Sequence, residues 1–268
     1  MVLSRGEVPQ KAKKFFFLAQ KEIIRIMTGS RPKTSWKPLF QSLEILTVHS
    51  QYILSLMKFL LQNQEVFTSN SEGVNMFYRK ASPPSNVKSS GQSILLLHGK
   101  SFTSETWQKL GTMHLMAGIG HVVIAVDLPG YGETVDSYHG DRSKFILSIM
   151  QSELLSENHP VLISPSMSGE YSVKFVVEHS DLLSGYIPVA PVATNSVSQE
   201  ILKNLKVPTL IVYGENDSTP MAKQAPHNLR IMPNSQEVPL KNAGHAAYLD
   251  QPDEFHTLLY NVMELLHQ

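Results

Sequence analysis

A run of small residues follows an apolar stretch near the middle of the chain, where Val161-Leu162-Ile163 leads into Ser164-Pro165-Ser166-Met167-Ser168-Gly169. A strand that turns sharply into a helix needs small residues two places before and two places after the central residue, because a larger side chain would collide in the turn. Ser164 and Ser168 meet that need and leave Ser166 at the tip, as in a nucleophile elbow with serine at both usual glycine positions. An ordinary serine-rich helix N-terminus is the alternative interpretation of this segment.

A serine nucleophile needs a base and a carboxylate that orients the base, and on such an elbow they follow in the order serine, acid, histidine. Asp217 is the favoured acid because it extends beyond the turn that begins at Gly214, and Glu215 is the weaker alternative. His245 is the candidate base, since it follows the last predicted strand within a tight turn that contains glycine. Taken singly, Asp217 fits an Asx turn and His245 a solvated loop. Their order and placement together favour a catalytic triad.

Two backbone N–H groups are needed to stabilise the charge that develops on a substrate oxygen during acyl transfer. The N–H of Met167, directly after the nucleophile, is expected to supply one of them. A strand-forming run ends in His98-Gly99-Lys100-Ser101, where the glycine lets the backbone approach the substrate closely. We predict the N–H of Lys100 as the second donor, with Ser101 as the alternative, and we expect His98 to brace the loop.

Other chemistries find no support in the sequence. Gly130-Tyr131-Gly132 lacks the third glycine and the spacing of a dinucleotide-binding loop, and neither a phosphate-binding Gly-x-x-x-x-Gly-Lys nor a zinc-binding His-Glu-x-x-His occurs. The chain has no cysteine, which excludes a disulfide framework, a thiolate zinc site and a cysteine nucleophile. We therefore expect no metal and no other cofactor.

The elements that must position these residues begin at about residue 72, where short aliphatic or β-branched runs alternate with amphipathic stretches of helical length. This alternation predicts an α/β fold with a mostly parallel sheet and helices on both faces. Reactive groups then collect in loops at the carboxyl ends of the strands. The predicted strands are 74–78, 93–97, 122–126, 161–164, 185–189, 209–213 and 236–240, and the predicted helices lie near 105–118, 141–156, 168–180, 197–204, 219–229 and 252–267.

The segment 190–206, between the predicted strands 185–189 and 209–213, leaves room for one short helix and no large cap domain. An uncapped site is open and shallow, which favours short acyl groups, or an acyl group presented on a larger molecule, over long lipids.

Charge divides the chain unevenly, although its 23 basic and 23 acidic residues cancel over the whole length. Residues 1–37 contain nine basic and two acidic residues and carry a net charge of +7, which leaves −7 on the remainder. We interpret residues 1–71 as a basic N-terminal arm with an amphipathic helical segment, and residues 72–268 as the catalytic domain. Removal of residues 1–37 should change where the protein is located and spare its turnover.

The apolar stretch 39–61 is long enough to cross a bilayer, but Glu44, His49, Gln51 and Lys58 interrupt it. A charge at the centre of a membrane-spanning helix costs about 2.5 to 3.5 kcal/mol. We therefore expect an amphipathic helix that lies on the protein or on a membrane surface. A cytoplasmic location is predicted, with membrane association through the N-terminal segment as the alternative.

Several of these motifs together resemble the α/β-hydrolase superfamily: His98-Gly99, Asp127-Leu128-Pro129-Gly130-Tyr131-Gly132, the serine-rich elbow, Tyr213-Gly214-Glu215-Asn216-Asp217 and Gly244-His245. The elbow, with the segments 106–112 and 188–191, resembles in particular the α/β-hydrolase domain-containing protein 14 family. Lys100-Ser101-Phe102 and residues 242–246 are closer to its A branch than to its B branch. The resemblance covers roughly residues 72–268 and implies Ser166 as nucleophile, Asp217 as acid and His245 as base.

The expected function is a serine hydrolase that cleaves short acyl esters or amides through an acyl-enzyme intermediate. Two alternatives stay open: transfer of the acyl group to a thiol such as coenzyme A, and a non-catalytic interaction module on the same fold. The expected partner is a small acyl substrate or an acylated protein. No nucleic acid is expected for the hydrolase domain, and membrane-surface contact is assigned to the N-terminal segment.

Overall fold

The computed structural model describes residues 69–71, 73–85, 87–155 and 159–266. The basic arm and the amphipathic segment 39–61 lie outside the described residues, so the expectations for them, and the division between residues 71 and 72, stay predictions. Within the described ranges, no helix combines the length and the apolar character that a membrane crossing requires.

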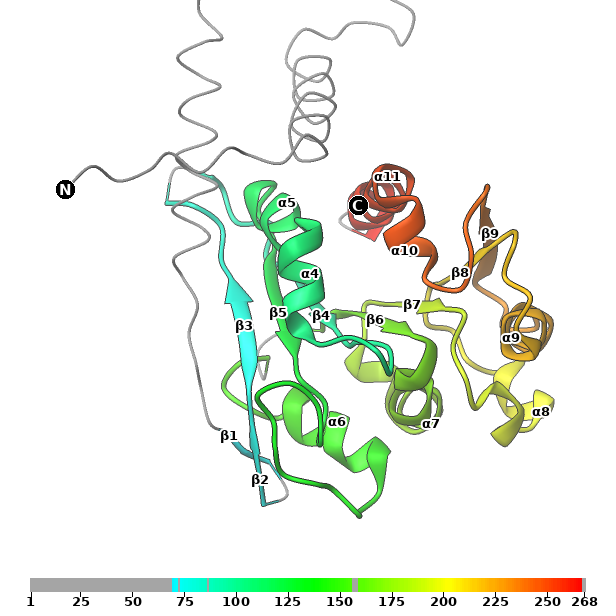
Figure 1. Ribbon diagram of the computed structural model, residues 1–268, viewed down its shortest axis with the longest axis horizontal. Helices are drawn as coiled ribbons and strands as arrows, with labels where there is room; N and C mark the ends of the chain where they lie inside the picture. Colours follow the sequence, from blue (N-terminus) through cyan, green and yellow to red (C-terminus); the bar gives the residue numbers. More distant parts are fainter. Residues whose placement is uncertain (1–68, 72, 86, 156–158, 267–268) are drawn as a thin grey trace, which may run out of the picture. The chain divides into compact units, whose positions relative to one another are not determined.

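Seven strands form the main sheet in the order β3-β5-β4-β6-β7-β8-β9 (Figure 1). The edge strand β3 pairs antiparallel with β5, and every other neighbouring pair in this sheet is parallel. The carboxyl ends of the six parallel strands therefore meet at one edge. The strands are β3 (Tyr78–Ala81), β4 (Ser93–Leu96), β5 (Val122–Val126), β6 (Val161–Pro165), β7 (Gly185–Val189), β8 (Thr209–Gly214) and β9 (Ser235–Leu240).

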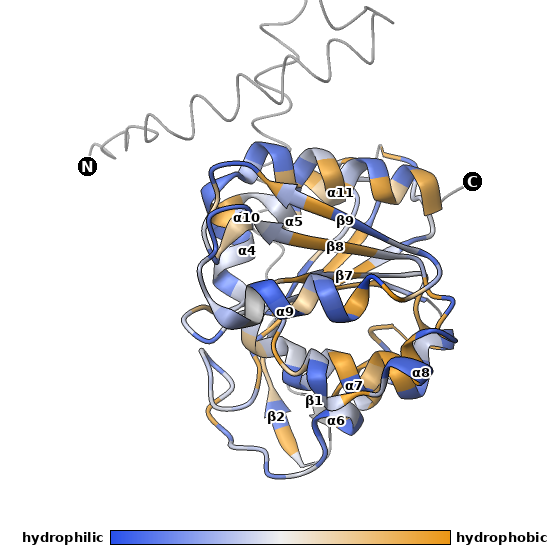
Figure 2. Ribbon diagram, turned by 90° about the vertical axis from the view of Figure 1, so that its right-hand side faces the viewer, coloured by the Kyte–Doolittle hydropathy of each residue, from blue (hydrophilic) through white to orange (hydrophobic). Residues whose placement is uncertain are grey.

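Helices cover both faces of the sheet (Figures 1 and 2). The pair α4 (Ser104–Leu110) and α5 (Thr112–Gly118) packs on one face with α10 (Ala247–Asp250) and α11 (Pro252–Leu266). The other face carries α6 (Arg142–Met150), α7 (Gly169–His179), α8 (Gln199–Leu202) and α9 (Pro220–Leu229). The described residues also include three short 3-10 helices, η1 (Ser166–Ser168), η2 (Ser180–Leu182) and η3 (Thr194–Ser196). The predicted α/β architecture is confirmed.

Two hydrophobic clusters, one on each face, explain why the central strands are apolar without alternation. In β4 and the residue directly after it, Ile94 and Leu96 contribute to the cluster under α4, α5 and α11, whereas Leu95 and Leu97 contribute to the cluster under α6 and α7. All four side chains are fully buried. Burial of one such side chain contributes about 1.5 to 3 kcal/mol to the free energy of unfolding. The central strands, whose ends carry the candidate residues, are therefore a stable part of the fold.

Two predicted elements are divided in the structure. The predicted helix 105–118 breaks at Gly111, whose φ of +87° ends α4 and begins α5. The predicted strand 74–78 separates at Phe77 into β3 and a short β2 (Val74–Met76), which pairs with β1 (Ser69–Ser71) in a hairpin through Gly73. The helix breaks because Gly111 turns the chain, and the strand breaks because β2 and β3 belong to different sheets. Hydrophobic periodicity predicts neither event.

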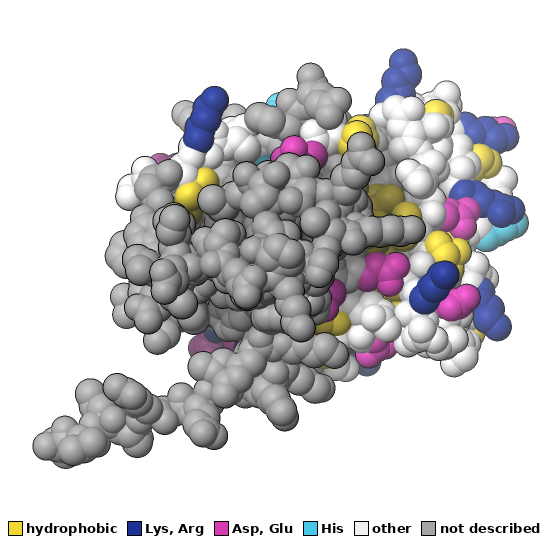
Figure 3. Space-filling model, turned by 90° about the horizontal axis from the view of Figure 1, so that it is seen from above, with side chains coloured by type: hydrophobic (Ala, Val, Ile, Leu, Met, Phe, Trp, Pro, Cys, Tyr) yellow, Lys and Arg dark blue, Asp and Glu magenta, His cyan; other side chains and the backbone are white. Residues whose placement is uncertain are grey.

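The connection between β7 and β8 contains only η3 and the four-residue helix α8. The predicted absence of a large cap domain is therefore confirmed. On the described surface in view in Figure 3, basic and acidic side chains are interspersed.

Candidate active site

The elbow forms where β6 ends at Pro165 and the chain turns through η1 into α7. Ser166 has a φ of +49°, in the left-handed region that a residue with a side chain adopts only under constraint. The N–H of Val192 donates to the carbonyl of Ser166 at 2.9 Å, which holds the turn from the neighbouring loop. A Cβ at Gly169 would lie 2.4 Å from the carbonyl oxygen of Val192, so only glycine permits this approach.

The acid candidate lies in the turn after β8. Asp217 has a side chain that is 1% exposed, and its Oδ1 accepts the N–H of Thr219 at 2.9 Å. Gly214 allows close packing against the next loop, since a Cβ there would lie 2.1 Å from the carbonyl oxygen of Gly244. The exposed alternative Glu215 is not the residue that bonds to the histidine.

The base candidate, His245, connects the acid and the serine. Its Nδ1 lies 2.6 Å from Oδ2 of Asp217, and its Nε2 lies 2.8 Å from Oγ of Ser166. Because an ionised carboxylate only accepts, the Nδ1–H donates to Asp217, which leaves the Nε2 lone pair to accept the hydroxyl proton of Ser166. The His245 side chain is 32% exposed and Ser166 is partly exposed, so solvent reaches this end of the line.

The acid loop and the base loop are joined by backbone hydrogen bonds. The N–H of Glu215 donates to the carbonyl of Leu240 at 3.0 Å, and the N–H of Asn216 donates to that of Ala243 at 2.8 Å. On the other side of the base, Oδ2 of Asp250 accepts the N–H of Gly244 at 2.7 Å. Asp217 and His245 are therefore carried on one interlocked piece of backbone.

The loop after β4 lies directly against the serine. A Cβ built at Gly99 would be 3.6 Å from the Cβ of Ser166, so the peptide that joins Gly99 to Lys100 passes beside the candidate nucleophile. The Met167 peptide follows Ser166 in the chain, and the Lys100 side chain is exposed. The structure thus places the backbone of both predicted oxyanion donors beside Ser166, and their roles as donors stay a prediction.

His98 is bonded to backbone groups through both ring nitrogens. Its Nδ1 donates to the carbonyl of Gly99 and its Nε2 accepts the N–H of Leu128, each at 2.9 Å. Burial lowers the pKa of His98, and the opposing effects of the Gly99 carbonyl and the Asp127 charge are smaller. The neutral ring therefore braces two loops at the edge of the sheet.

Asp127 is a buried anchor at the same edge. Its Oδ1 accepts the N–H of Ser104 at 2.6 Å, and its Oδ2 accepts that of Glu133 at 2.9 Å. The carboxylate thereby ties the start of α4 to the turn after β5. In the described part of the chain, no group of three or more His, Cys, Asp or Glu side chains is arranged to hold a metal ion.

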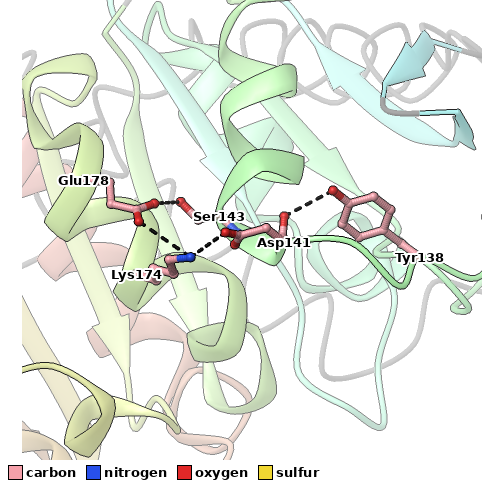
Figure 4. A network of polar contacts seen from close by, with 5 residues as sticks. All are labelled: Tyr138, Asp141, Ser143, Lys174 and Glu178. Atoms are coloured by element: carbon pink, nitrogen blue, oxygen red, sulfur yellow. Dashed lines mark hydrogen bonds and ion pairs between the residues drawn. The ribbon is translucent and has the colours of Figure 1, made fainter.

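Polar contacts fasten the helix that follows the elbow to α6 (Figure 4). Lys174 on α7 pairs with Asp141 and lies 3.6 Å from Glu178, while Ser143 donates to Glu178 at 2.5 Å. The hydroxyl of Tyr138 donates to the Asp141 carbonyl at 3.2 Å. Lys174 lowers the pKa of Asp141. Partly exposed pairs contribute little stability each, so these contacts add only modestly to the packing of α7 on α6.

The sequence-based interpretation missed one polar group behind the elbow. Ser164 and Ser168 were expected only to be small, yet their hydroxyls bond to each other and, through Ser172, to Tyr186 on β7. Serines at every fourth position, 164, 168 and 172, are the signal that was available in the sequence.

The sheet order, the sharp turn after β6 and the arrangement at the carboxyl edge define an α/β-hydrolase. The chain is 43% identical over 199 residues to protein ABHD14A of Danio rerio, a match that covers 71% of this chain and 72% of that protein. It is 38% identical over 205 residues to the Rattus norvegicus protein named "Putative protein-lysine deacylase ABHD14B", covering 74% of this chain and 95% of that protein. The chain therefore belongs to the ABHD14 family.

The higher identity to the Danio rerio ABHD14A than to the Rattus norvegicus ABHD14B agrees with the predicted similarity to the A branch. No protein-family model matches the chain.

Solved structures share the fold over most of the chain. A "predicted CIB-like hydrolase" from Thermoplasma acidophilum has a TM-score of 0.64 at 26% identity and covers 76% of this chain and 97% of its own. An esterase from Exiguobacterium antarcticum has a TM-score of 0.61 at 15% identity, with coverages of 75% and 99%, and this likeness concerns the fold alone. Relatives and neighbours together place the chain among hydrolases in general.

Proposed function

We propose that the protein is a serine hydrolase that removes short acyl groups through an acyl-enzyme intermediate. The observation that carries the proposal is the unbroken line of hydrogen bonds from Ser166 through His245 to Asp217, at 2.8 and 2.6 Å. These are the distances over which a base takes a proton from a nucleophile and a carboxylate orients the base.

In the proposed reaction, Oγ of Ser166 attacks the acyl carbonyl while Nε2 of His245 takes the hydroxyl proton. Asp217 holds the imidazole in the required tautomer and stabilises the imidazolium. The N–H groups of Met167 and Lys100 stabilise the oxyanion. His245 then gives its proton to the departing alcohol or amine. Water attacks the acyl-enzyme with His245 again as base, which releases the carboxylic acid and regenerates Ser166.

The proposed substrate class is a short acyl group, either on a small ester or on the lysine of a protein. The connection between β7 and β8 supports the first part, because η3 and α8 do not form a cap that would enclose a long chain. The name of the ABHD14B relatives supports the second part, since it reads "Putative protein-lysine deacylase ABHD14B". The partly exposed His245 fits an acyl group presented on a larger molecule.

Labelling with a fluorophosphonate probe tests the nucleophile. The wild-type protein should be labelled, Ser166→Ala should not, and Ser196→Ala should be labelled at the wild-type rate, because Ser196 is an exposed serine that donates only to the Ala193 carbonyl. Equal labelling of wild type and Ser166→Ala would contradict the assignment. Complete absence of labelling in the wild type would favour a non-catalytic interaction module.

Turnover of a panel of substrates tests the acyl group and its acceptor. Acetyl and butyryl p-nitrophenyl esters and acetyl-lysine peptides should be cleaved faster than esters of long fatty acids. Faster turnover of the long-chain esters would contradict the proposed open site. Addition of coenzyme A to the same assays separates the acceptors, because acyl-coenzyme A accumulates only when the thiol replaces water.

A further inference from the structure

Four buried hydroxyl groups form a continuous chain behind the elbow. Oγ of Ser168 donates to the carbonyl of Pro165 at 2.8 Å and lies 2.9 Å from Oγ of Ser164. Oγ of Ser164 lies 2.6 Å from that of Ser172, which in turn lies 2.9 Å from the hydroxyl of Tyr186. All four hydroxyl-bearing residues are at most 1% exposed.

The four contacts allow one arrangement of protons. A carbonyl only accepts, so the proton of Ser168 goes to Pro165. Each hydroxyl has a single proton, so Ser164 must then donate to Ser168, Ser172 to Ser164, and Tyr186 to Ser172. Burial raises the pKa of Tyr186, which keeps the first donor of the chain protonated. The result is a one-directional chain from Tyr186 on β7 to the residue immediately before Ser166.

The strand pairing explains how the chain of hydroxyl groups connects three secondary-structure elements. In the parallel ladder between β6 and β7, Tyr186 is registered with Leu162. Ser164 lies two residues further along β6, and Ser172 lies in the first turn of α7. The hydroxyl groups therefore connect β6 before the elbow, α7 after it and the neighbouring strand β7 (Figure 1).

We infer that the hydroxyl chain Tyr186–Ser172–Ser164–Ser168 positions the nucleophile Ser166, and this inference rests on the proposed function. Serine occupies the two places where an elbow usually has glycine, so side chains fill the space inside the turn. Buried hydroxyls are unfavourable unless they are bonded, and here every one is bonded. The last donor fixes the Pro165 carbonyl on one side of Ser166, and the N–H of Val192 fixes the Ser166 carbonyl on the other.

The position of each residue along the chain predicts a graded effect on the reactivity of Ser166. The rate constant of inactivation by a fluorophosphonate should fall by about tenfold in Ser168→Ala, the equivalent of one hydrogen bond. The loss should be smaller in Ser172→Ala and smallest, about twofold, in Tyr186→Phe, since the lost donor is progressively farther from Pro165. The inhibitor dissociation constant should not change, because none of these side chains contacts the substrate.

Ser143→Ala is the matched control, because Ser143 is also a fully buried serine with a hydroxyl bonded to one side chain, Glu178. It should lower the thermal melting temperature and leave the inactivation rate constant unchanged. Ser168→Gly is a second variant for the case in which Ser168→Ala does not fold. Glycine is the residue that usual elbows have at this position, and this variant also lacks the hydroxyl.

A double-mutant cycle separates positioning from packing. If Tyr186 acts on Ser166 through the chain, Tyr186→Phe should reduce the inactivation rate constant in the wild type but have no further effect in Ser168→Gly, while the melting temperatures change additively. An equal effect of Tyr186→Phe in both backgrounds, or rate losses that follow the melting temperatures, would overturn the inference. If the wild type itself does not react with the probe, the proposed function fails instead.

Discussion

The loops after β4 and after β9 both place a histidine at the carboxyl edge of the sheet, yet the two rings have different surroundings. Both ring nitrogens of His98 bond to backbone groups, from Gly99 and Leu128, and the side chain is fully buried. His245 bonds to two side chains, Asp217 and Ser166, and a third of it is exposed. A histidine held by backbone supports the fold, whereas one held between a carboxylate and a hydroxyl can transfer a proton.

The largest effect should separate the two histidines by activity. His245→Ala should lower kcat by a factor on the order of 10⁶, because loss of the proposed base would remove the activation of Ser166. His98→Ala should change kcat of the folded protein by less than about tenfold, because both ring nitrogens bond to backbone groups and neither bonds to Ser166. Hydrolysis of p-nitrophenyl acetate measures both. Equal losses in the two variants would remove the distinction between the loops.

The second effect concerns the acceptor that distinguishes His245 from His98. Asp217→Asn keeps the size of the side chain but presents an amide to Nδ1, which favours the wrong tautomer of His245, and kcat should fall by about 10⁴-fold. The circular dichroism spectrum of Asp217→Asn should match that of the wild type, which would show that the fold is unchanged. Glu215→Gln is the matched control and should keep wild-type kcat, since the Glu215 side chain is exposed and does not bond to His245.

A third histidine extends the comparison to the dependence of stability on pH. Burial lowers the pKa of His256 on α11 from 6.5 to about 4. Between these two values the unfolded chain binds a proton that the folded chain does not, so the free energy of unfolding decreases as the pH falls from 6.5 towards 4. The loss from this residue should be about 3 kcal/mol.

Urea denaturation at pH 7 and at pH 4.5 measures this loss. In His256→Gln the decrease in unfolding free energy between the two pH values should be smaller, because the buried imidazole is gone. The lowered pKa of His98 acts in the same direction. An identical decrease in wild type and His256→Gln would contradict the assignment.

The smallest of the four effects tests the bracing by His98 itself. In His98→Ala the buried N–H of Leu128 loses its acceptor, and the free energy of unfolding should fall by about 2 kcal/mol. His139→Ala is the control, because His139 is exposed and its replacement should change stability by less than about 0.5 kcal/mol. A loss in His98→Ala no larger than in His139→Ala would show that the backbone bonds of His98 contribute nothing.

Much of the fold could be predicted because the central strands are apolar on both faces and are separated by amphipathic stretches. The predicted strands 122–126 and 185–189 have the bounds of β5 and β7. The break at Gly111 was not predicted, since periodicity continues across it and only its left-handed φ interrupts the helix. The antiparallel edge strand β3 depends on pairing across the chain, which local patterns do not encode.

The part of the candidate site that depends on the order of motifs along the chain could be predicted. Ser166, Asp217 and His245 each follow a strand of one parallel sheet, so their meeting at one edge follows from topology. Tyr186 was missed because its hydroxyl reaches the elbow across the ladder of β6 and β7. An apolar β7 gave no reason to expect a polar role for one of its residues.

The interlocked loops after β8 and β9 have a consequence for how specificity can diverge among related enzymes. Their contacts use the N–H groups of residues 215 and 216 and the carbonyls of residues 240 and 243, which any amino acid except proline at the donor positions supplies. The position most restricted by space is Gly214, where a Cβ would lie 2.1 Å from the carbonyl oxygen of Gly244. The exposed side chains at 215 and 216 are thus free to vary, so the preference of the proposed enzyme for its substrate can drift over evolutionary time while the proposed acid and base keep their alignment.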